Sequence, residues 1–220
     1  SMHTNGGARA ASWWRSLGSV MSGRNYVRFG IDGLEDTNHL YRQHVNWRTL
    51  MRNAQAFIAG GGNAQWDYLV FAHNEHQVEA ARDLAVALGF SEFSPKKTQR
   101  FLSKATGIAR PTYGVKDRSG AVVRDLEPPR AAEWVNTEVE HTWRQLLSSY
   151  GSQEAVHAAS VVHCKTGRDG DRSVYLAADG LVWPCCWLAQ QMYLLRPIIL
   201  LTADPFCIGI LYCFECRSRL

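Results

Sequence analysis

Short apolar runs and longer amphipathic segments alternate along the first hundred residues of the chain. The runs are rich in branched and aromatic residues and predict four strands, at residues 2–4, 26–31, 65–71 and 90–97. Apolar residues at helical spacing predict the helices between them, at residues 11–17, 46–59 and 78–88. We expect Asn74 to cap the third helix, with Gln77 completing a capping box, and Gly89 to end it with a left-handed backbone.

Strands and helices that alternate in this way predict a parallel sheet covered by helices, and so an α/β fold. The four strands are too few to close an eight-stranded barrel. Two interpretations stay open at this point. The chain starts partway through a larger fold, or it forms an open sheet.

The pattern changes after residue 100. Residues 100–127 are rich in Gly, Pro and charge and predict a connector, with a hairpin turn at residues 117–120. Pro128 and Pro129 should open a helix that continues to about Leu147, because an apolar stripe follows them. Further on, Asp179 and Gly180 predict the turn of a second hairpin. We therefore expect three regions, at residues 1–100, 101–150 and 151–220.

Composition narrows the class of protein. Of the 220 residues, 46% are hydrophobic and 20% are charged, which is enough apolar material for a full core. The net charge of +4 comes from scattered Lys and Arg, without the dense basic run of a nucleic-acid groove, so we expect no nucleic-acid partner. The first ten residues lack the basic and apolar regions of a secretory signal, which favours a cytoplasmic location.

The segment after Met192 turns abruptly apolar. A membrane-spanning helix needs about 20 mostly apolar residues. Arg196, Pro197, Asp204 and Pro205 interrupt this segment, so we expect no span. An altered reading frame in the coding sequence is a further hypothesis for the change of composition, and resequencing the gene tests it.

All six cysteines lie after residue 163, at positions 164, 185, 186, 207, 213 and 216. This segregation predicts a separate cysteine-rich domain. In a reducing compartment, clustered thiols more often bind metals or iron-sulfur clusters than form disulfides. Cys213 and Cys216 form a CxxC pair, which can grip one metal ion. The alternative is that several cysteines are buried as small apolar residues.

Polar residues follow the first two predicted strands. Asn5 follows the first strand and Asp32 ends the second, so both should project from the carboxyl edge of a parallel sheet, where α/β folds bind ligands. Asp32 could then accept hydrogen bonds from a ribose or an amine. The alternative for Asp32 and Gly33 is an ordinary turn.

Several longer stretches are more specific than their parts. The stretch FGIDGLEDTNHLYRQHVNW, residues 29–47, resembles the fourth-strand region of the radical S-adenosylmethionine enzymes, and the HTNG of residues 3–6 resembles the third. YLVFAHNEHQVEAA, residues 68–81, is similar to the fifth strand and its helix, and FSPKKTQRF, residues 93–101, to the sixth. The resemblance implies an incomplete barrel of the TIM type, with about four parallel strands and their helices.

The same resemblance implies residues that line an S-adenosylmethionine pocket. By position they are Asn5, Asp32, Arg42 and Asn74. Arg42 suits the methionyl carboxylate, because a guanidinium group makes two parallel hydrogen bonds to a carboxylate. The alternative for Arg42 is a solvated surface arginine.

The cysteine region is also similar to a part of such enzymes. Cys164 and the segment YLAADGLVWPCCWLA, residues 175–189, resemble the auxiliary iron-sulfur domain of the SPASM or twitch type, in which a β-hairpin lies between two ligand cysteines. The resemblance implies Cys164 and Cys185 as ligands of a [4Fe-4S] cluster, with Cys186 competing with Cys185. Cys207, Cys213 and Cys216 remain available to complete the site.

Two features depart from the family. The CxxxCxxC motif that binds the catalytic cluster is absent from the sequence, and so are the first two strands of the expected six. Either the chain is a fragment of a longer enzyme, which we favour, or it is a member that has lost activity.

Three hypotheses follow for function. The first is an iron-sulfur enzyme of the radical type that binds S-adenosylmethionine and, in complete form, modifies a peptide or another large substrate, with an electron-donor protein as partner. The second is a non-catalytic interaction protein that holds zinc or an iron-sulfur cluster. The third is a plain α/β domain whose cysteines bind no metal.

Overall fold

The chain divides into two compact units, Ser1–Ser149 and Tyr150–Leu220, and each is described by itself. The computed structural model describes residues 1–21, 23–103, 106–117, 119–160, 175–176 and 181–183.

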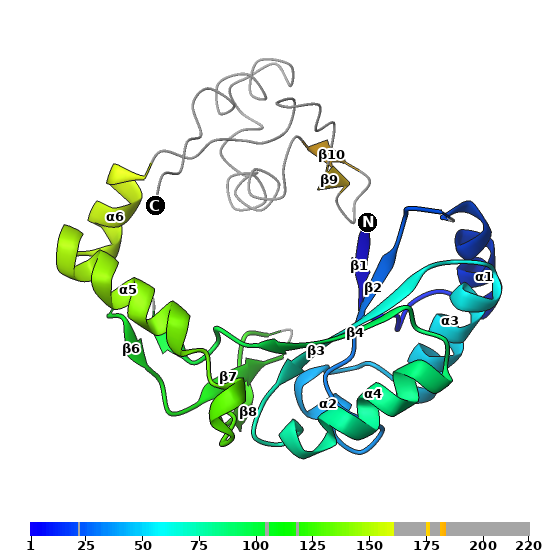
Figure 1. Ribbon diagram of the computed structural model, residues 1–220, viewed down its shortest axis with the longest axis horizontal. Helices are drawn as coiled ribbons and strands as arrows, with labels where there is room; N and C mark the ends of the chain where they lie inside the picture. Colours follow the sequence, from blue (N-terminus) through cyan, green and yellow to red (C-terminus); the bar gives the residue numbers. More distant parts are fainter. Residues whose placement is uncertain (22, 104–105, 118, 161–174, 177–180, 184–220) are drawn as a thin grey trace. The chain divides into compact units, whose positions relative to one another are not determined.

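The first unit is built on a four-stranded parallel sheet. Its strands lie in chain order across the sheet and are β1 (Met2–Thr4), β2 (Val27–Gly30), β3 (Ala64–Val70) and β4 (Glu92–Lys97). Figure 1 shows the connecting helices on one side of the sheet: α1 (Ala11–Val20), α3 (Trp47–Ala59) and α4 (Val78–Ala87). The predicted α/β class and its four parallel strands are therefore confirmed.

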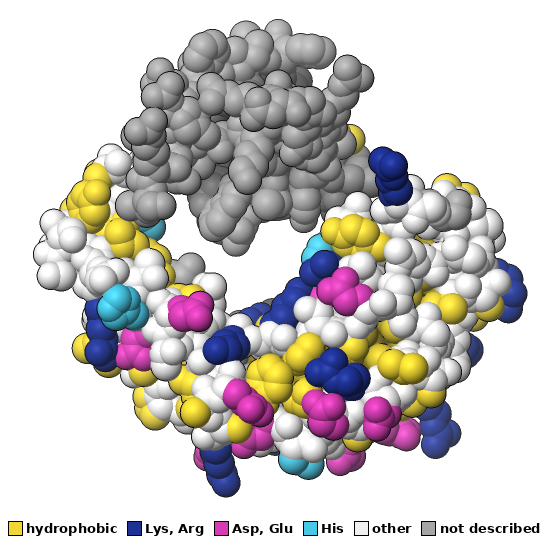
Figure 2. Space-filling model, in the orientation of Figure 1, with side chains coloured by type: hydrophobic (Ala, Val, Ile, Leu, Met, Phe, Trp, Pro, Cys, Tyr) yellow, Lys and Arg dark blue, Asp and Glu magenta, His cyan; other side chains and the backbone are white. Residues whose placement is uncertain are grey.

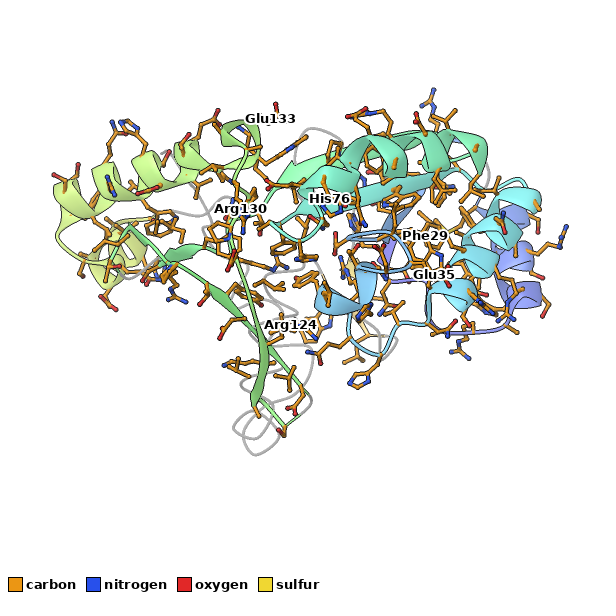
Figure 3. All side chains as sticks on the ribbon, turned by 90° about the horizontal axis from the view of Figure 1, so that it is seen from below. Phe29, Glu35, His76, Arg124, Arg130 and Glu133 are labelled. Atoms are coloured by element: carbon orange, nitrogen blue, oxygen red, sulfur yellow. The ribbon has the colours of Figure 1, made fainter. Side chains whose placement is uncertain are left out.

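The core lies between the sheet and these helices. Buried and half-buried residues alternate along the whole of β3, so that Trp66 faces the helices while Asp67 faces the other way. Phe29 on β2 points into the same layer (Figure 3), with its ring centroid 5.3 Å from that of Trp14 and 6.0 Å from that of Phe57. Burial of these large rings is the main term that holds the helices on the sheet.

The ends of the predicted helices are confirmed in part. Asn46 is the N-cap of α3, because its side chain accepts a hydrogen bond from the backbone N–H of Thr49 at 2.9 Å. Gly89 follows the last residues of α4 with a φ of 83°, as expected. The predicted capping box is wrong. A short 3₁₀ helix, η1 (Glu75–Gln77), precedes α4, and the Asn74 side chain makes no capping bond.

Residues 100–127 contain two hairpins where the sequence predicts a connector with one turn. The strands are β5 (Leu102–Ser103) with β6 (Ile108–Ala109), and β7 (Tyr113–Lys116) with β8 (Val122–Leu126), both pairs antiparallel. The predicted turn is confirmed. Asp117 Oδ1 accepts hydrogen bonds from the backbone N–H groups of Ser119 and Ala121, at 2.8 and 3.2 Å.

The helix predicted from Pro128 begins later than expected. A 3₁₀ turn, η2 (Ala132–Trp134), comes first, and Val135 is extended, so that α5 covers Thr137–Tyr150. Within the second unit, α6 (Gln153–Ala159) is capped by Ser152. β9 (Tyr175–Leu176) pairs antiparallel with β10 (Val182–Trp183), at the position of the second predicted hairpin.

The cysteines and the segment after Met192 lie outside the described residues. None of the helices in the described ranges is both long enough and apolar enough to cross a membrane.

Candidate functional site

The face of the sheet opposite the helices carries charged side chains on three neighbouring strands. Asp67 on β3 forms ion pairs with Lys96 on β4, Oδ2 to Nζ at 2.5 Å, and with Arg28 on β2, Oδ1 to Nη1 at 3.5 Å. Arg28 also donates a hydrogen bond to Gln65 Oε1 at 2.9 Å. In Figure 2, Lys, Arg, Asp and Glu side chains lie among apolar ones on the surface of this unit. The charges of this network are half-buried, so they interact more strongly than they would in bulk water.

Asp32 follows β2 and is completely buried. Its Oδ2 accepts a hydrogen bond from Arg42 Nε at 2.5 Å, and its Oδ1 accepts one from the backbone N–H of Leu69 at 2.6 Å. Burial raises the pKa of Asp32, while the guanidinium of Arg42 and the N–H of Leu69 act in the opposite direction. Both carboxylate oxygens are engaged within the protein. Through these bonds Asp32 positions Arg42, and its direct contact with a ribose or an amine stays a prediction.

Asn74 lies next to Asp32 and is also completely buried. Its side-chain nitrogen donates hydrogen bonds to the backbone carbonyls of Asp32 and Leu69, each at 2.9 Å, and its Oδ1 accepts one from the backbone N–H of Phe71 at 2.7 Å. The amide of Asn74 therefore ties the segment after β2 to the end of β3. The hydrogen-bonding groups of this amide are all used by backbone groups, which would otherwise be buried without partners.

Arg42 can lie against β2 because residue 30 is glycine. A Cβ atom at Gly30 would come within 2.4 Å of Nη2 of Arg42, closer than such atoms approach in proteins. Arg42 follows a short helix, α2 (Asn38–Tyr41), which the sequence did not predict. Asn38 holds this helix to the sheet, because its Oδ1 accepts a hydrogen bond from the backbone N–H of Asp32 at 2.9 Å.

The terminal nitrogens of Arg42 remain available to a ligand. Its side chain is 29% exposed, and its hydrogen bond to Asp32 uses Nε. Both Nη groups therefore keep donors that no described residue accepts. A guanidinium with one fixed side and one open side is well suited to a bidentate bond with an anion.

One pocket of about 380 Å³ brings these residues together, and we call it the sheet pocket. It is lined by His3, Thr4, Asn5, Arg28, Gly30, Asp32, Arg42, Asp67, Leu69 and Lys96. Three of the four residues that the resemblance assigns to an S-adenosylmethionine pocket are among them, although they lie far apart in the sequence. The fourth, Asn74, contacts the backbone of Asp32 instead.

Sequence reasoning missed Gly30, Asn38 and Lys96 as parts of this site. Lys96 had no local signal, because β4 shows no alternation; its parallel pairing with Leu69 in the folded sheet places it on the polar face. The contribution of Gly30 has no local signal, since it depends on an arginine twelve residues further along the chain.

A metal site stays a prediction. Among the residues that the structure describes, no group of three or more His, Cys, Asp or Glu side chains could hold a metal ion. The cysteines expected to bind an iron-sulfur cluster lie outside those residues: Cys164, Cys185, Cys186, Cys213 and Cys216.

Comparison with known proteins gives no relative. No family model, no curated protein and no solved structure matches the chain.

Proposed function

We propose that the sheet pocket binds S-adenosylmethionine, and that the chain is a fragment or a degenerate member of a radical S-adenosylmethionine enzyme. The observation that carries this proposal is the arrangement of Arg42, whose Nε is fixed by Asp32 while its terminal nitrogens stay open beside Gly30. The methionyl group of S-adenosylmethionine ends in a carboxylate, which two parallel N–H groups bind well.

The other polar groups of the sheet pocket suit the rest of the methionyl group. Its α-ammonium group needs acceptors, and the carboxylate of Asp67 lies in the same pocket. Lys96 and Arg28 pair with Asp67 in the same pocket, so this network offers cations to the α-carboxylate beside an anion for the ammonium group. Asn5 contributes a side-chain amide from the segment after β1. The donors and acceptors of the pocket therefore match a zwitterion.

In this proposal the four strands form part of an incomplete TIM-type barrel. The parallel strand order supports it, and so does the position of Asn5 and Asp32 just after β1 and β2, at the carboxyl ends of strands where such barrels bind their ligands. When bound, the catalytic cluster of the family supplies the electron for reductive cleavage of the sulfonium. The chain has no CxxxCxxC motif, so its own residues contribute the binding and orientation of the ligand.

The cysteine-rich region completes the proposal. Cys164 and Cys185, with Cys186 as the competing choice, would hold an auxiliary [4Fe-4S] cluster together with ligands from Cys213 and Cys216. The substrate would then be a peptide or another large molecule, and an electron-donor protein would be the partner.

A second candidate function is a non-catalytic interaction protein that holds zinc or an iron-sulfur cluster. The absence of the CxxxCxxC motif favours it, because a protein without the catalytic cluster can retain the sheet for contact with a partner and the cysteines for structure.

Calorimetric titration of the full chain with S-adenosylmethionine tests the ligand. The variant Arg42→Lys keeps a cation for Asp32 but loses the paired N–H groups, so we expect it to weaken binding about tenfold. Arg48→Lys is the matched control, because among the described residues Arg48 pairs only with the exposed Glu35. Absence of binding to the unchanged chain, or an equal loss in both variants, contradicts the proposal.

Anaerobic purification and metal analysis test the cofactor. Iron with acid-labile sulfide, lost together in Cys164→Ser and Cys185→Ser, is the expected result. Zinc without sulfide favours the second candidate function. A protein that carries neither element contradicts both.

A further inference from the structure

A second and larger pocket adjoins the sheet pocket, and we call it the hairpin pocket. It has a volume of about 690 Å³ and lies within the first unit, between the segment after β2 and the hairpin of β7 and β8. Its lining residues are Asn5, Tyr41, Arg42, Gln43, Val45, Arg110, Thr112, Tyr113, Gly114, Val115, Lys116 and Val122. Asn5 and Arg42 belong to both pockets, and the proposal for the sheet pocket uses none of the hairpin residues.

The charged side chains in the lining of the hairpin pocket all carry the same sign. They are Arg42, Arg110 and Lys116, and no Asp or Glu is among the described lining residues. Arg110 and Lys116 are exposed, and neither forms an ion pair with a residue that the structure describes. Nothing within the described pocket wall neutralises these two cations, so the pocket has a positive potential that attracts anions.

The uncharged groups of the lining also present hydrogen-bond donors. The Oδ1 atom of Asn5 accepts a hydrogen bond from the backbone N–H of Gly7 at 3.1 Å, which leaves its NH₂ group to donate. Burial raises the pKa of Tyr41, so its phenol keeps its proton at neutral pH. The guanidinium carbon of Arg100 lies 4.9 Å from the ring centroid of Tyr41 and 5.7 Å from that of Tyr113. This contact holds both rings in place.

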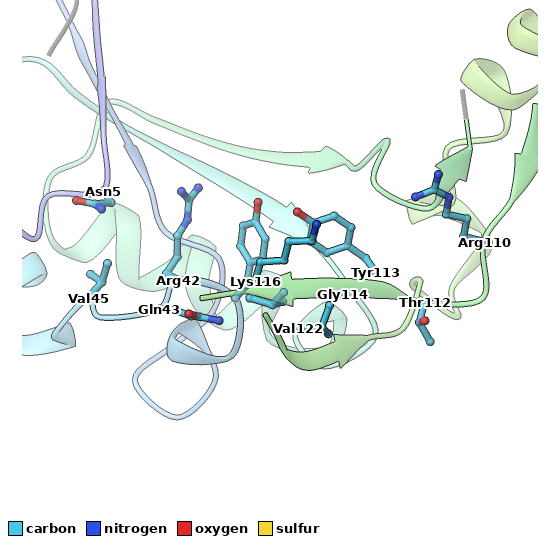
Figure 4. Close-up of a pocket in the computed structure, with 12 residues that line it drawn as sticks. Asn5, Arg42, Gln43, Val45, Arg110, Thr112, Tyr113, Gly114, Lys116 and Val122 are labelled. Carbon is cyan, nitrogen blue, oxygen red and sulfur yellow. The ribbon is translucent and has the colours of Figure 1, made fainter. Parts of the chain in front are cut away.

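The cations are spread along the pocket. Figure 4 shows Arg42 and Arg110 at opposite ends, with Lys116 and Tyr113 between them. A ligand that meets all three cations must therefore carry more than one negative group. The volume of the pocket lies within the range of about 300–1,000 Å³ that is typical of small-molecule sites.

We propose that the hairpin pocket binds a small molecule with two or more anionic groups, held between Arg42 at one end and Arg110 at the other, with Lys116 between them. Carboxylates and phosphates share the chemistry that these donors recognise. The site is separate from the S-adenosylmethionine site proposed above, although the two would share Arg42.

Titration of the full chain with inorganic pyrophosphate, and separately with citrate, tests this site at one fixed ionic strength. The first probe represents phosphates and the second represents carboxylates. We expect at least one of them to bind, and we expect Arg110→Gln with Lys116→Gln, combined in one variant, to weaken that binding about tenfold or more. Binding of neither probe overturns the proposal.

The control variant combines Arg24→Gln with Arg52→Gln. It removes the same charge from two exposed arginines that line neither pocket. We expect it to bind as the unchanged chain does, and an equal loss in both double variants overturns the proposal, because it would show only an effect of net charge. Far-ultraviolet circular dichroism of both variants confirms that they are folded.

Titration of the same variants with S-adenosylmethionine separates the two proposals. The change at Arg110 and Lys116 should leave S-adenosylmethionine affinity unchanged, since neither residue lines the sheet pocket. If neither anion binds, the proposal that the sheet pocket binds S-adenosylmethionine is unaffected. If S-adenosylmethionine does not bind, the proposal for the hairpin pocket is likewise unaffected.

Discussion

The side-chain nitrogen of Asn74 donates a hydrogen bond to the backbone carbonyl of Asp32 at 2.9 Å, across 42 positions of sequence. Through this bond a residue that lines no part of the sheet pocket fixes the backbone of one that does. Asp32 in turn orients Arg42. The direction of the open side of the guanidinium therefore depends on the buried side-chain amide of Asn74, which acts through Asp32 and does not itself contact a ligand in the sheet pocket.

Asn74→Ala should therefore destabilise the first unit strongly. The substitution leaves the N–H of Phe71 and the carbonyls of Asp32 and Leu69 buried without their partner. We expect a loss of about 3 kcal/mol in the free energy of unfolding, measured with urea. Asn46→Ala is a useful comparison, because it removes only the cap of α3 and should cost about 1 kcal/mol. Similar losses of unfolding free energy in the two variants would contradict the prediction that the amide of Asn74 stabilises the fold more than a helix cap does.

Asp32→Asn tests the buried ion pair. The change keeps the shape of the side chain but removes the charge that faces Arg42 Nε, so we expect a loss of about 2 kcal/mol in unfolding free energy. The control is Glu35→Gln, whose partner Arg48 is 89% exposed, and whose loss should be below about 0.5 kcal/mol. Equal urea midpoints for Asp32→Asn and the unchanged chain would contradict this assignment.

Gly30→Ala tests the close approach of Arg42 to β2. The added Cβ would lie 2.4 Å from Nη2, so the guanidinium must move away from the strand. We expect weaker binding of S-adenosylmethionine, by about tenfold, with a small change in stability. Gly7→Ala is the matched control, because a Cβ there meets nothing closer than 3.5 Å. If both alanine variants bind S-adenosylmethionine equally well, the position of the Arg42 guanidinium does not determine the affinity, which contradicts the prediction.

His73 gives the protein a predictable dependence on pH. Its ring stacks on Phe71 at 5.4 Å, and both ring nitrogens are buried without a hydrogen-bond partner among the described residues. Burial, and then the charges of Arg124, His76 and His39, lower the pKa of His73 from 6.5 to about 4. The folded state therefore binds fewer protons than the unfolded state between these two values. Stability that is present above pH 6.5 should be lost as the pH falls towards 4.

His73→Phe should remove this dependence while keeping the ring stacked on Phe71. Urea unfolding at about pH 7.0 and at about pH 4.5, which is just above the lowered pKa of His73, measures the change in unfolding free energy. The unchanged chain should lose more stability between the two conditions than the variant does. His141→Gln, at an exposed position of α5, serves as the control and should follow the unchanged chain. Parallel losses in all three proteins would contradict the prediction.

Much of the sheet could be predicted from the sequence, because its signals are local. The alternation in β3 and the helical spacing in α3 are properties of a few consecutive residues. Asn74 shows where local reasoning fails. Its sequence context is that of a helix cap, but the backbone groups after β2 and β3 have no partner in the sheet, and they take its amide instead.

The candidate site was only partly predictable for the same reason. The carboxyl edge of a parallel sheet is implied by strand order, and this brings Asn5 and Asp32 to one pocket. The turn between β7 and β8 was predicted at residues 117–120, but the two strands gave no comparable signal. Most of β8 is exposed, so no apolar alternation marks it, and the tyrosine contacts of Arg100 depend on the folded chain.

The order of the strands has a consequence for assembly. β1 and β4 are the outer strands of the sheet, and each pairs with one neighbour only within the described part of the chain. The outward N–H and C=O groups of such a strand form a template, and an extended segment can join it without breaking any bond already present. Lateral growth of this kind would widen the same polar surface that carries Asp67 and Lys96. Ligand binding on the polar face and association through the outer strands would then take place on the same sheet.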